Sequence, residues 1–288
     1  MAACCLPGPR ARARLKLFLA LSRTPHGLLD MATPLALAFL WLGRLPSPGV
    51  LLLGMFTAFA GYTAVYALND LADYRTDRDN FRDAPPDDTG FLDAVYARHP
   101  MAQGLLTLRE GMLWAVGWGV AALIGAYLLN PACAALLVLG CLLEVAYCKL
   151  LRVSHLRALV NGVVKTLGGV AAVLAVDAQA PSWFLALAFC ALFAWEVGGQ
   201  NIPADWFDLD LDRRQGARTM PLVLGLERAA RLSLFCLGAA LGLTALLLAL
   251  APAGLPWWLV LAATAVNARL LLLPAWEQTQ CLDRGGAM

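Results

Sequence analysis

The sequence predicts an all-α polytopic membrane protein with about eight transmembrane helices, arranged as two tandem four-helix repeats. The chain of 288 residues is 60% hydrophobic and only 15% charged, whereas soluble domains are roughly 45–50% apolar and about 25% charged. Its scarce acids are grouped, because twelve of the fifteen Asp lie in two windows, 70–93 and 205–212. The composition excludes a disordered, fibrous or ordinary soluble protein.

Eight apolar stretches approach or reach the roughly 17–25 residues that cross a hydrocarbon core of about 30 Å. In chain order they cover residues 28–43, 49–69, 111–129, 132–148, 158–176, 182–200, 232–252 and 255–275. An even number of spans places both termini and both groups of Asp on one face of the membrane.

Nearly all Lys and Arg lie on that same face, and the opposite loops hold only Arg44. The positive-inside rule makes the basic face cytoplasmic. We therefore expect an integral protein of a bacterial cytoplasmic membrane, with both termini and the functional site inside. A net charge of +2 gives no reason to expect a nucleic-acid partner, and no obligatory protein partner is inferred.

The two acidic segments share one spacing. NDLADYRTD places Asp70, Asp73 and Asp77 at i, i+3 and i+7, and DWFDLDLD repeats that pattern at a constant offset of 135. If helical, each triplet lines one face over two turns. We therefore expect a cytoplasmic tail over 1–22 and two repeats, 23–150 and 151–288, with an insertion within 80–97 of the first repeat.

Three carboxylates on one helix face repel one another, at roughly 4 kcal/mol per pair for a separation of about 4 Å and an effective dielectric near 20. A bound cation relieves this repulsion. Oxygen ligands without Cys or His suit Mg²⁺, which takes one or two carboxylates together with substrate phosphate oxygens. Two acidic walls that face each other therefore predict a diphosphate held through Mg²⁺. The alternative, a solvated acidic loop, would explain either segment alone but not why both share one spacing.

These residues resemble a known family. NDLADYRTD is similar to the N-D-x-x-D-x-x-x-D motif of the UbiA superfamily of intramembrane prenyltransferases, and DLDLDRRQGARTMP to its D-x-x-x-D motif followed by G-x-R-T-x-P. The resemblance implies prenyl transfer from a polyprenyl diphosphate to an acceptor, inside a helical bundle around a central cavity.

The resemblance also implies roles for individual residues. One Mg²⁺ would be held by Asn69, Asp70, Asp73 and Asp77, and the other by Asp208 and Asp212, with Asp205 added by the internal repeat. Arg23 in SRTP and Tyr147 resemble family residues that would approach the diphosphate, and Arg218 belongs to the second motif.

Further polar residues are substrate-binding candidates from their position alone. Asn161 and Lys165 share a helix face within a predicted span, while Lys149 and Arg152 lie at its cytoplasmic mouth. Intramembrane ionisable groups usually face a cavity or a partner, although snorkelling is the alternative for the basic residues. Asp30, with His26 one turn earlier, is a candidate for binding a polar acceptor, and no His is expected to bind metal.

The predicted function is Mg²⁺-dependent transfer of a prenyl group to a lipophilic acceptor, most plausibly an aromatic quinone precursor. A terpene cyclase, a prenyltransferase with a phosphosugar or glycerol phosphate acceptor, and an ion transporter are the alternatives. Two features depart from the family pattern: eight spans stand where nine are usual, and Arg98-His99-Pro100 stands where Arg usually precedes Pro directly.

Overall fold

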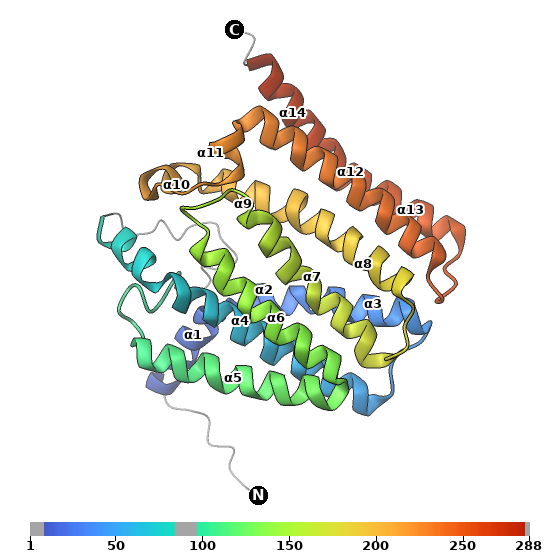
Figure 1. The fold of residues 1–288 in the computed structure, drawn as a ribbon, viewed down its shortest axis with the longest axis horizontal. Helices are drawn as coiled ribbons and strands as arrows, with labels where there is room; N and C mark the ends of the chain where they lie inside the picture. Colours follow the sequence, from blue (N-terminus) through green and yellow to red (C-terminus); the bar gives the residue numbers. More distant parts are fainter. Residues whose placement is uncertain (1–8, 84–96, 286–288) are drawn as a thin grey trace, which may run out of the picture. The chain divides into compact units, whose positions relative to one another are not determined.

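The computed structural model describes residues 9–83 and 97–285, and within them it contains helices and turns but no strand. Residues 1–8 of the expected tail and residues 84–96 of the expected insertion lie outside the described residues. The helices, labelled in Figure 1, are α1 (Pro9–Leu21), α2 (Thr24–Asp30), α3 (Ala32–Leu42), α4 (Pro48–Asp83), α5 (Leu108–Leu129), α6 (Pro131–Lys149), α7 (Arg157–Val176), α8 (Ser182–Trp195), the π-helical η2 (Glu196–Asn201), α9 (Ile202–Phe207), α10 (Leu209–Gln215), α11 (Met220–Leu224), α12 (Leu226–Leu250), α13 (Trp257–Asn267), the π-helical η3 (Ala268–Leu272) and α14 (Leu273–Gly285).

Seven helical segments of the described chain are long and apolar enough to cross a membrane. They are Pro48–Asp79, Leu108–Leu129, Pro131–Lys149, Arg157–Val176, Ser182–Phe207, Leu226–Leu250 and Trp257–Leu282. Each contains or overlaps one predicted span. Many large apolar side chains are exposed along these helices, among them Leu142, Phe235 and Trp257, as expected for surfaces that contact lipid instead of water. The prediction of an all-α membrane protein is confirmed.

The remaining predicted span, 28–43, is divided between α2 and α3. Pro34 has no N–H to donate to the carbonyl of Asp30, four residues earlier, so the helical hydrogen-bond ladder is interrupted there. The Tyr62 hydroxyl donates instead to the Asp30 carbonyl, at 3.4 Å. The interruption leaves two short helices, neither of which is long enough to cross a membrane alone.

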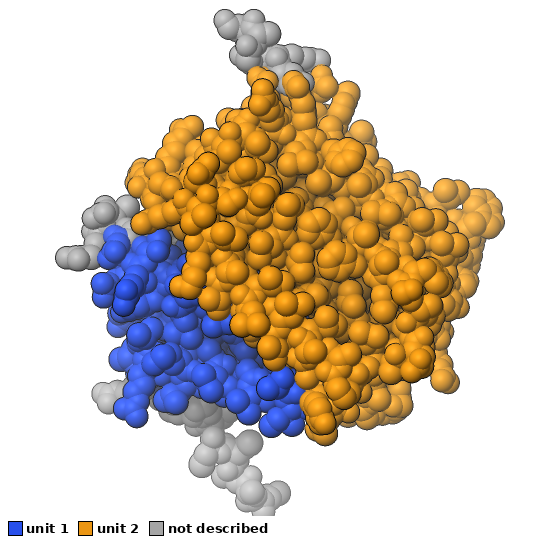
Figure 2. All heavy atoms as spheres, viewed as in Figure 1, with its two compact units in different colours: residues 1–32, 55–125 blue, residues 33–54, 126–288 orange. Residues whose placement is uncertain are grey.

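The described chain forms two compact units, coloured separately in Figure 2. Unit 1 comprises 1–32 and 55–125, and unit 2 comprises 33–54 and 126–288. These boundaries reflect which residues pack together in space, and they differ from the predicted repeat boundary at 150/151. The repeat boundary was inferred from sequence spacing and stays a prediction.

Unit 1 is built around the C-terminal half of α4. Its buried core contains Leu21, Ala67, Met101, Leu106 and Ala115. The Trp114 indole donates to the Ser22 hydroxyl at 2.8 Å, which fixes the end of α1 against α5. This packing holds the turn after α1 beside the acidic end of α4.

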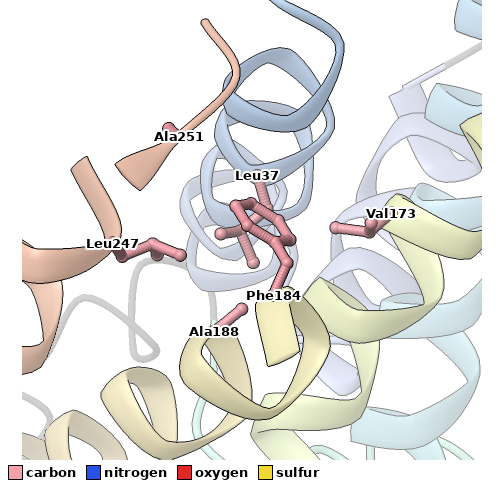
Figure 3. Close-up of a cluster of buried hydrophobic side chains, with 6 residues drawn as sticks. All are labelled: Leu37, Val173, Phe184, Ala188, Leu247 and Ala251. Carbon is pink, nitrogen blue, oxygen red and sulfur yellow. The ribbon is translucent and has the colours of Figure 1, made fainter. Parts of the chain in front are cut away.

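Unit 2 is a set of helices that pack successively, with α7 between α6 and α8, and α8 against α12 (Figure 1). Phe184 is fully buried at the start of α8, and Figure 3 shows its ring among Leu37, Val173 and Ala188. Fully burying a side chain of this size contributes about 1.5–3 kcal/mol. This cluster anchors the end of α8 remote from the acidic segment.

One close helix contact recurs in both units at the offset of the acidic motifs. A Cβ added to Gly27 would lie 3.4 Å from the Tyr62 side chain in unit 1, and one added to Gly162 would lie 2.8 Å from Val197 in unit 2. Gly162 and Val197 lie 135 positions after Gly27 and Tyr62, respectively. In unit 1 a glycine of α2 thus lies against α4, which carries the first acids. In unit 2 a glycine of α7 lies against η2, the turn that leads into the second acidic segment.

Candidate active site

The first acidic cluster lies in the C-terminal half of α4, in unit 1. Asp70 is buried, with a relative exposure of 4%, while Asn69, Asp73 and Asp77 are partly buried. The Arg23 guanidinium donates to Asn69 Oδ1 at 3.1 Å and to Asp70 Oδ1 at 3.3 Å. Three predicted site residues, Arg23, Asn69 and Asp70, are therefore joined here through one guanidinium.

His99 also belongs to this cluster. Its Nδ1 lies 3.1 Å from Asp70 Oδ1 and 3.1 Å from Asp77 Oδ2. Burial would lower the pKa of His99, but the two carboxylates outweigh burial and raise it to about 9. Without a metal, the imidazole is therefore a cation at neutral pH and offsets part of the carboxylate repulsion.

The second acidic cluster lies in unit 2, where α9 gives way to α10. Asp205 lies on α9, Asp208 lies at the junction of the two helices, and Asp212 lies on α10. The three carboxylates are close enough to act on one another electrostatically. Burial and the Asp208 carboxylate together raise the pKa of Asp212 to about 6.

Arg157, at the start of α7, is the buried cation of the second cluster. Its guanidinium lies 4.0 Å from the centre of the Tyr147 ring and interacts electrostatically with Asp205 and Asp212. A guanidinium stacked on an aromatic face is held in place by the cation–π attraction. Tyr147 therefore positions the charge that faces the second motif.

The residues present fit divalent cations. Asp205 Oδ2 and Asp212 Oδ2 are buried and have no hydrogen-bond partner among the described residues. A buried acceptor without a partner costs about 1–3 kcal/mol and is a sign of an ion or water at that place. In unit 1, Asp70, Asp77 and His99 each offer a ligand atom within 4.8 Å of the others.

The remaining predicted substrate-binding residues all lie in unit 2. Lys149 and Arg152 are exposed at and just after the end of α6. The Arg218 side chain is exposed as well, and its backbone N–H donates to the Leu151 carbonyl at 2.7 Å. That bond ties the second motif to the loop between α6 and α7.

Asn161 and Lys165 lie on α7 and are partly buried, as their shared helix face suggested. The Asn161 amide donates to Asn201 Oδ1 at 2.6 Å. This bond joins α7 to η2, one turn before Asp205.

The sequence argument missed two site residues, Arg157 and His99. Arg157 faces the first Asp of its motif as Arg23 faces Asp70, but the two Arg are 134 positions apart, one fewer than the repeat offset. His99 immediately precedes Pro100, where the resemblance noted a departure. Arg157 could have been found by allowing the repeat offset to vary by one residue. The signal for His99 was its place between Arg98 and Pro100, where the family pattern has Arg directly before Pro.

Comparison with protein-family models gives a match to the UbiA prenyltransferase family over residues 31–283. No curated protein sequence matches.

Several solved structures share the fold. The apo structure of a UbiA homolog from Aeropyrum pernix K1 is 21% identical, with a TM-score of 0.64 over 88% of this chain and 92% of its own. A UbiA homolog from Archaeoglobus fulgidus bound to DMAPP and Mg²⁺ is 18% identical, with a TM-score of 0.67 over 93% of this chain and 87% of its own. A digeranylgeranylglyceryl phosphate synthase is 16% identical, with a TM-score of 0.65 over 93% of each chain.

Proposed function

The chain belongs to the UbiA prenyltransferase family, and we propose that it transfers a prenyl group from a prenyl diphosphate to an aromatic acceptor, with one Mg²⁺ at each acidic cluster. The observation that carries the proposal is the pair of carboxylate clusters, each with one buried Asp and with a buried or partly buried Arg beside it. A structural neighbour solved with DMAPP and Mg²⁺ supports the donor and the metal.

The metal ligands of the proposal are the acids of the two motifs. Asn69, Asp70, Asp73 and Asp77 would hold one ion, and Asp205, Asp208 and Asp212 the other. When bound, Mg²⁺ supplies positive charge against the departing diphosphate. Orphaned carboxylate oxygens at Asp205 and Asp212 support this assignment.

The chain's own cations complete the charge balance. Arg23 and Arg157 each lie beside one motif and would bind diphosphate oxygens, because a guanidinium presents several donors in a fixed plane. Tyr147 holds Arg157 in orientation through the stacked ring. In a site with little water these interactions are stronger than at a surface, so breakage of the allylic C–O bond is favoured there.

An aromatic hydroxyl is the acceptor that best fits the residues around Asp30. The Tyr66 hydroxyl donates to Asp30 Oδ2 at 2.5 Å, and His26 Nε2 lies 3.6 Å from Asp30 Oδ1. The rings of Tyr62 and Tyr66 are stacked, with centroids 6.5 Å apart. A phenolic acceptor would bring a hydrogen-bond donor to Asp30, whereas a phosphorylated acceptor would bring a second anion.

The test is a product assay on the purified full-length chain. Prenyl diphosphates of several lengths are incubated with Mg²⁺ and with hydroxybenzoate-type or dihydroxynaphthoate-type aromatics, a glycerol phosphate, or no acceptor. We expect prenylated aromatics by mass spectrometry. Cyclised hydrocarbons without an acceptor, or a prenylated glycerol phosphate alone, would contradict the acceptor assignment.

A further inference from the structure

The side chain of His99 lies among the carboxylates of the first cluster and has a relative exposure of only 16%. The turn that carries it is anchored on both sides, because Ala97 before it and Pro100 and Met101 after it are buried, and the Gln103 N–H donates to the His99 carbonyl at 3.2 Å. The backbone of His99 has φ +49°, a left-handed conformation that few non-glycine residues adopt. The fold thus holds this imidazole against α4.

One nitrogen of His99 serves two carboxylates. Nδ1 can carry only one hydrogen, yet it lies 3.1 Å from an oxygen of Asp70 and 3.1 Å from an oxygen of Asp77. Neighbouring ligands of an octahedral ion with bonds of about 2.1–2.2 Å lie roughly 3 Å apart. The separations between the nitrogen and the two oxygens therefore match the edges of a coordination shell.

We propose that His99 is a metal ligand through Nδ1, so that the first cluster is a mixed nitrogen and oxygen site that prefers a first-row transition ion such as Mn²⁺ over Mg²⁺. Imidazole is a ligand of transition metals, whereas Mg²⁺ prefers oxygen. The metal would take the place of the proton shared among the three groups. The inference rests on the proposed function only in treating the first cluster as a metal site.

Among the described residues, the second cluster has no imidazole of this kind. Pro221 matches Pro100 in the repeat, so Met220 occupies the position of His99. Its backbone N–H donates a hydrogen bond to Asp205 instead. The two sites are therefore chemically unequal: the second offers carboxylate oxygens, and the first adds a nitrogen.

The direct test is pulsed EPR of Mn²⁺ bound to the full-length protein in nitrogen-free buffer, after removal of any histidine tag. We expect a ¹⁴N hyperfine coupling that changes to the ¹⁵N pattern when the wild-type protein is labelled with ¹⁵N-histidine. This measurement needs no substitution and does not depend on a variant that folds. A Mn²⁺ signal without histidine coupling would overturn the proposal.

Variants locate the ligand among the three histidines of the chain. His99→Gln should abolish the coupling and lower the Mn²⁺ to Mg²⁺ affinity ratio by about tenfold, whereas His155→Gln should retain both. A coupling that persists in His99→Gln would contradict the assignment. Mg²⁺-dependent prenyl transfer without nitrogen coupling would refute this inference alone, and nitrogen coupling without prenyl transfer would refute the proposed function alone.

Discussion

A cationic side chain accompanies the first carboxylate of each motif. Arg23 donates to Asp70, and Arg157 acts on Asp205 while it stacks on Tyr147. Buried carboxylates are unfavourable unless a charge or hydrogen bond compensates them. Each cation offsets part of the cost of the carboxylates beside it, while the Asp205 and Asp212 oxygens that have no partner among the described residues leave part of the compensation to a ligand.

Replacement of Arg157 by Gln tests this compensation. Arg157 is 7% exposed, and its loss would leave Asp205 and Asp212 without their buried cation. We expect the metal-free protein to lose about 1–3 kcal/mol, seen as a fall of several degrees in the unfolding temperature, and Mg²⁺ to restore part of it.

Arg213→Gln is the matched control, because Arg213 is exposed and pairs only loosely with Asp210, at 3.8 Å. Such a surface pair contributes little to stability. The unfolding temperature of Arg213→Gln should therefore equal that of the wild type, both with and without Mg²⁺. Equal losses in the two variants, or no recovery of Arg157→Gln by Mg²⁺, would contradict the role given to Arg157.

Residue spacing predicted the acidic half of the site but only part of its basic half. Asp70, Asp73 and Asp77 follow the i, i+3, i+7 spacing along one helix, α4, whereas their counterparts keep that spacing across the junction of α9 and α10. His99 comes after an insertion, and the position of a loop side chain depends on tertiary packing. No periodicity in the sequence could place it between Asp70 and Asp77.

At the scale of elements, the π-helical turn η2 directly precedes α9 and so sets the direction of the helix that carries Asp205. Pro203 cannot donate to the carbonyl of Gly199, and the Asn201 amide donates back to the Glu196 carbonyl at 2.8 Å. The Ser233 hydroxyl of α12 donates to the Gly198 carbonyl. Two carbonyls of the wider turn, those of Glu196 and Gly198, thus accept side-chain hydrogen bonds. The turn shifts the register of the helix just before Asp205, and π-helical turns often occur near functional sites.

Gly198 permits this close contact with α12, which makes Gly198→Ala a test of the element. An added Cβ would lie 2.8 Å from the Ser233 backbone oxygen and 2.4 Å from Cys236 Cβ. We expect a loss of about 1–3 kcal/mol from overpacking, measured by thermal unfolding in detergent.

Gly242→Ala serves as the comparison within α12, since nothing lies within 4 Å of the added Cβ. An alanine in an open helical position should be neutral or stabilise by about 0.5–1 kcal/mol. If Gly198→Ala were as stable as Gly242→Ala, η2 would not be held against α12 in the way described.

Hydropathy predicted the long helices well and their irregularities poorly. A run of apolar residues predicts length and membrane class, so α5, α6 and α7 agree with their predicted spans to within three residues, while α12 begins six residues before its predicted span. The division at Met31 and the π-helical turn η2 depend on the carbonyls that lose a donor to Pro34 and to Pro203, respectively. The sequence shows this loss only when each Pro is matched with the carbonyl four residues before it, which then has no helical N–H donor.

At the scale of the whole molecule, the chain is an integral membrane protein of the UbiA prenyltransferase family. Its orientation stays a prediction, from the concentration of Lys and Arg on the face that carries the acids. The charged segments around α10 should therefore be cytoplasmic, and the loop that contains Arg44 should be outside.

Alkaline phosphatase fusions in a bacterial host measure that orientation. The enzyme is active only after export, so fusion after Ser47 should give high activity and fusion after Gly216 should give low activity. Green fluorescent protein at the same positions should give the reverse pattern of fluorescence. High phosphatase activity after Gly216 would contradict the predicted topology.

The central claim is that two carboxylate clusters use Mg²⁺ to release diphosphate from a prenyl donor, and the most direct measurement is diphosphate release with and without the metal. Wild-type protein with geranyl diphosphate and an aromatic acceptor should release diphosphate with Mg²⁺ and not with EDTA. Asp208→Asn should lower the rate at least about 10²-fold, while Asp210→Asn, at an 86% exposed side chain, should leave it unchanged. Release that is independent of Mg²⁺, or equal in the two variants, would contradict the account.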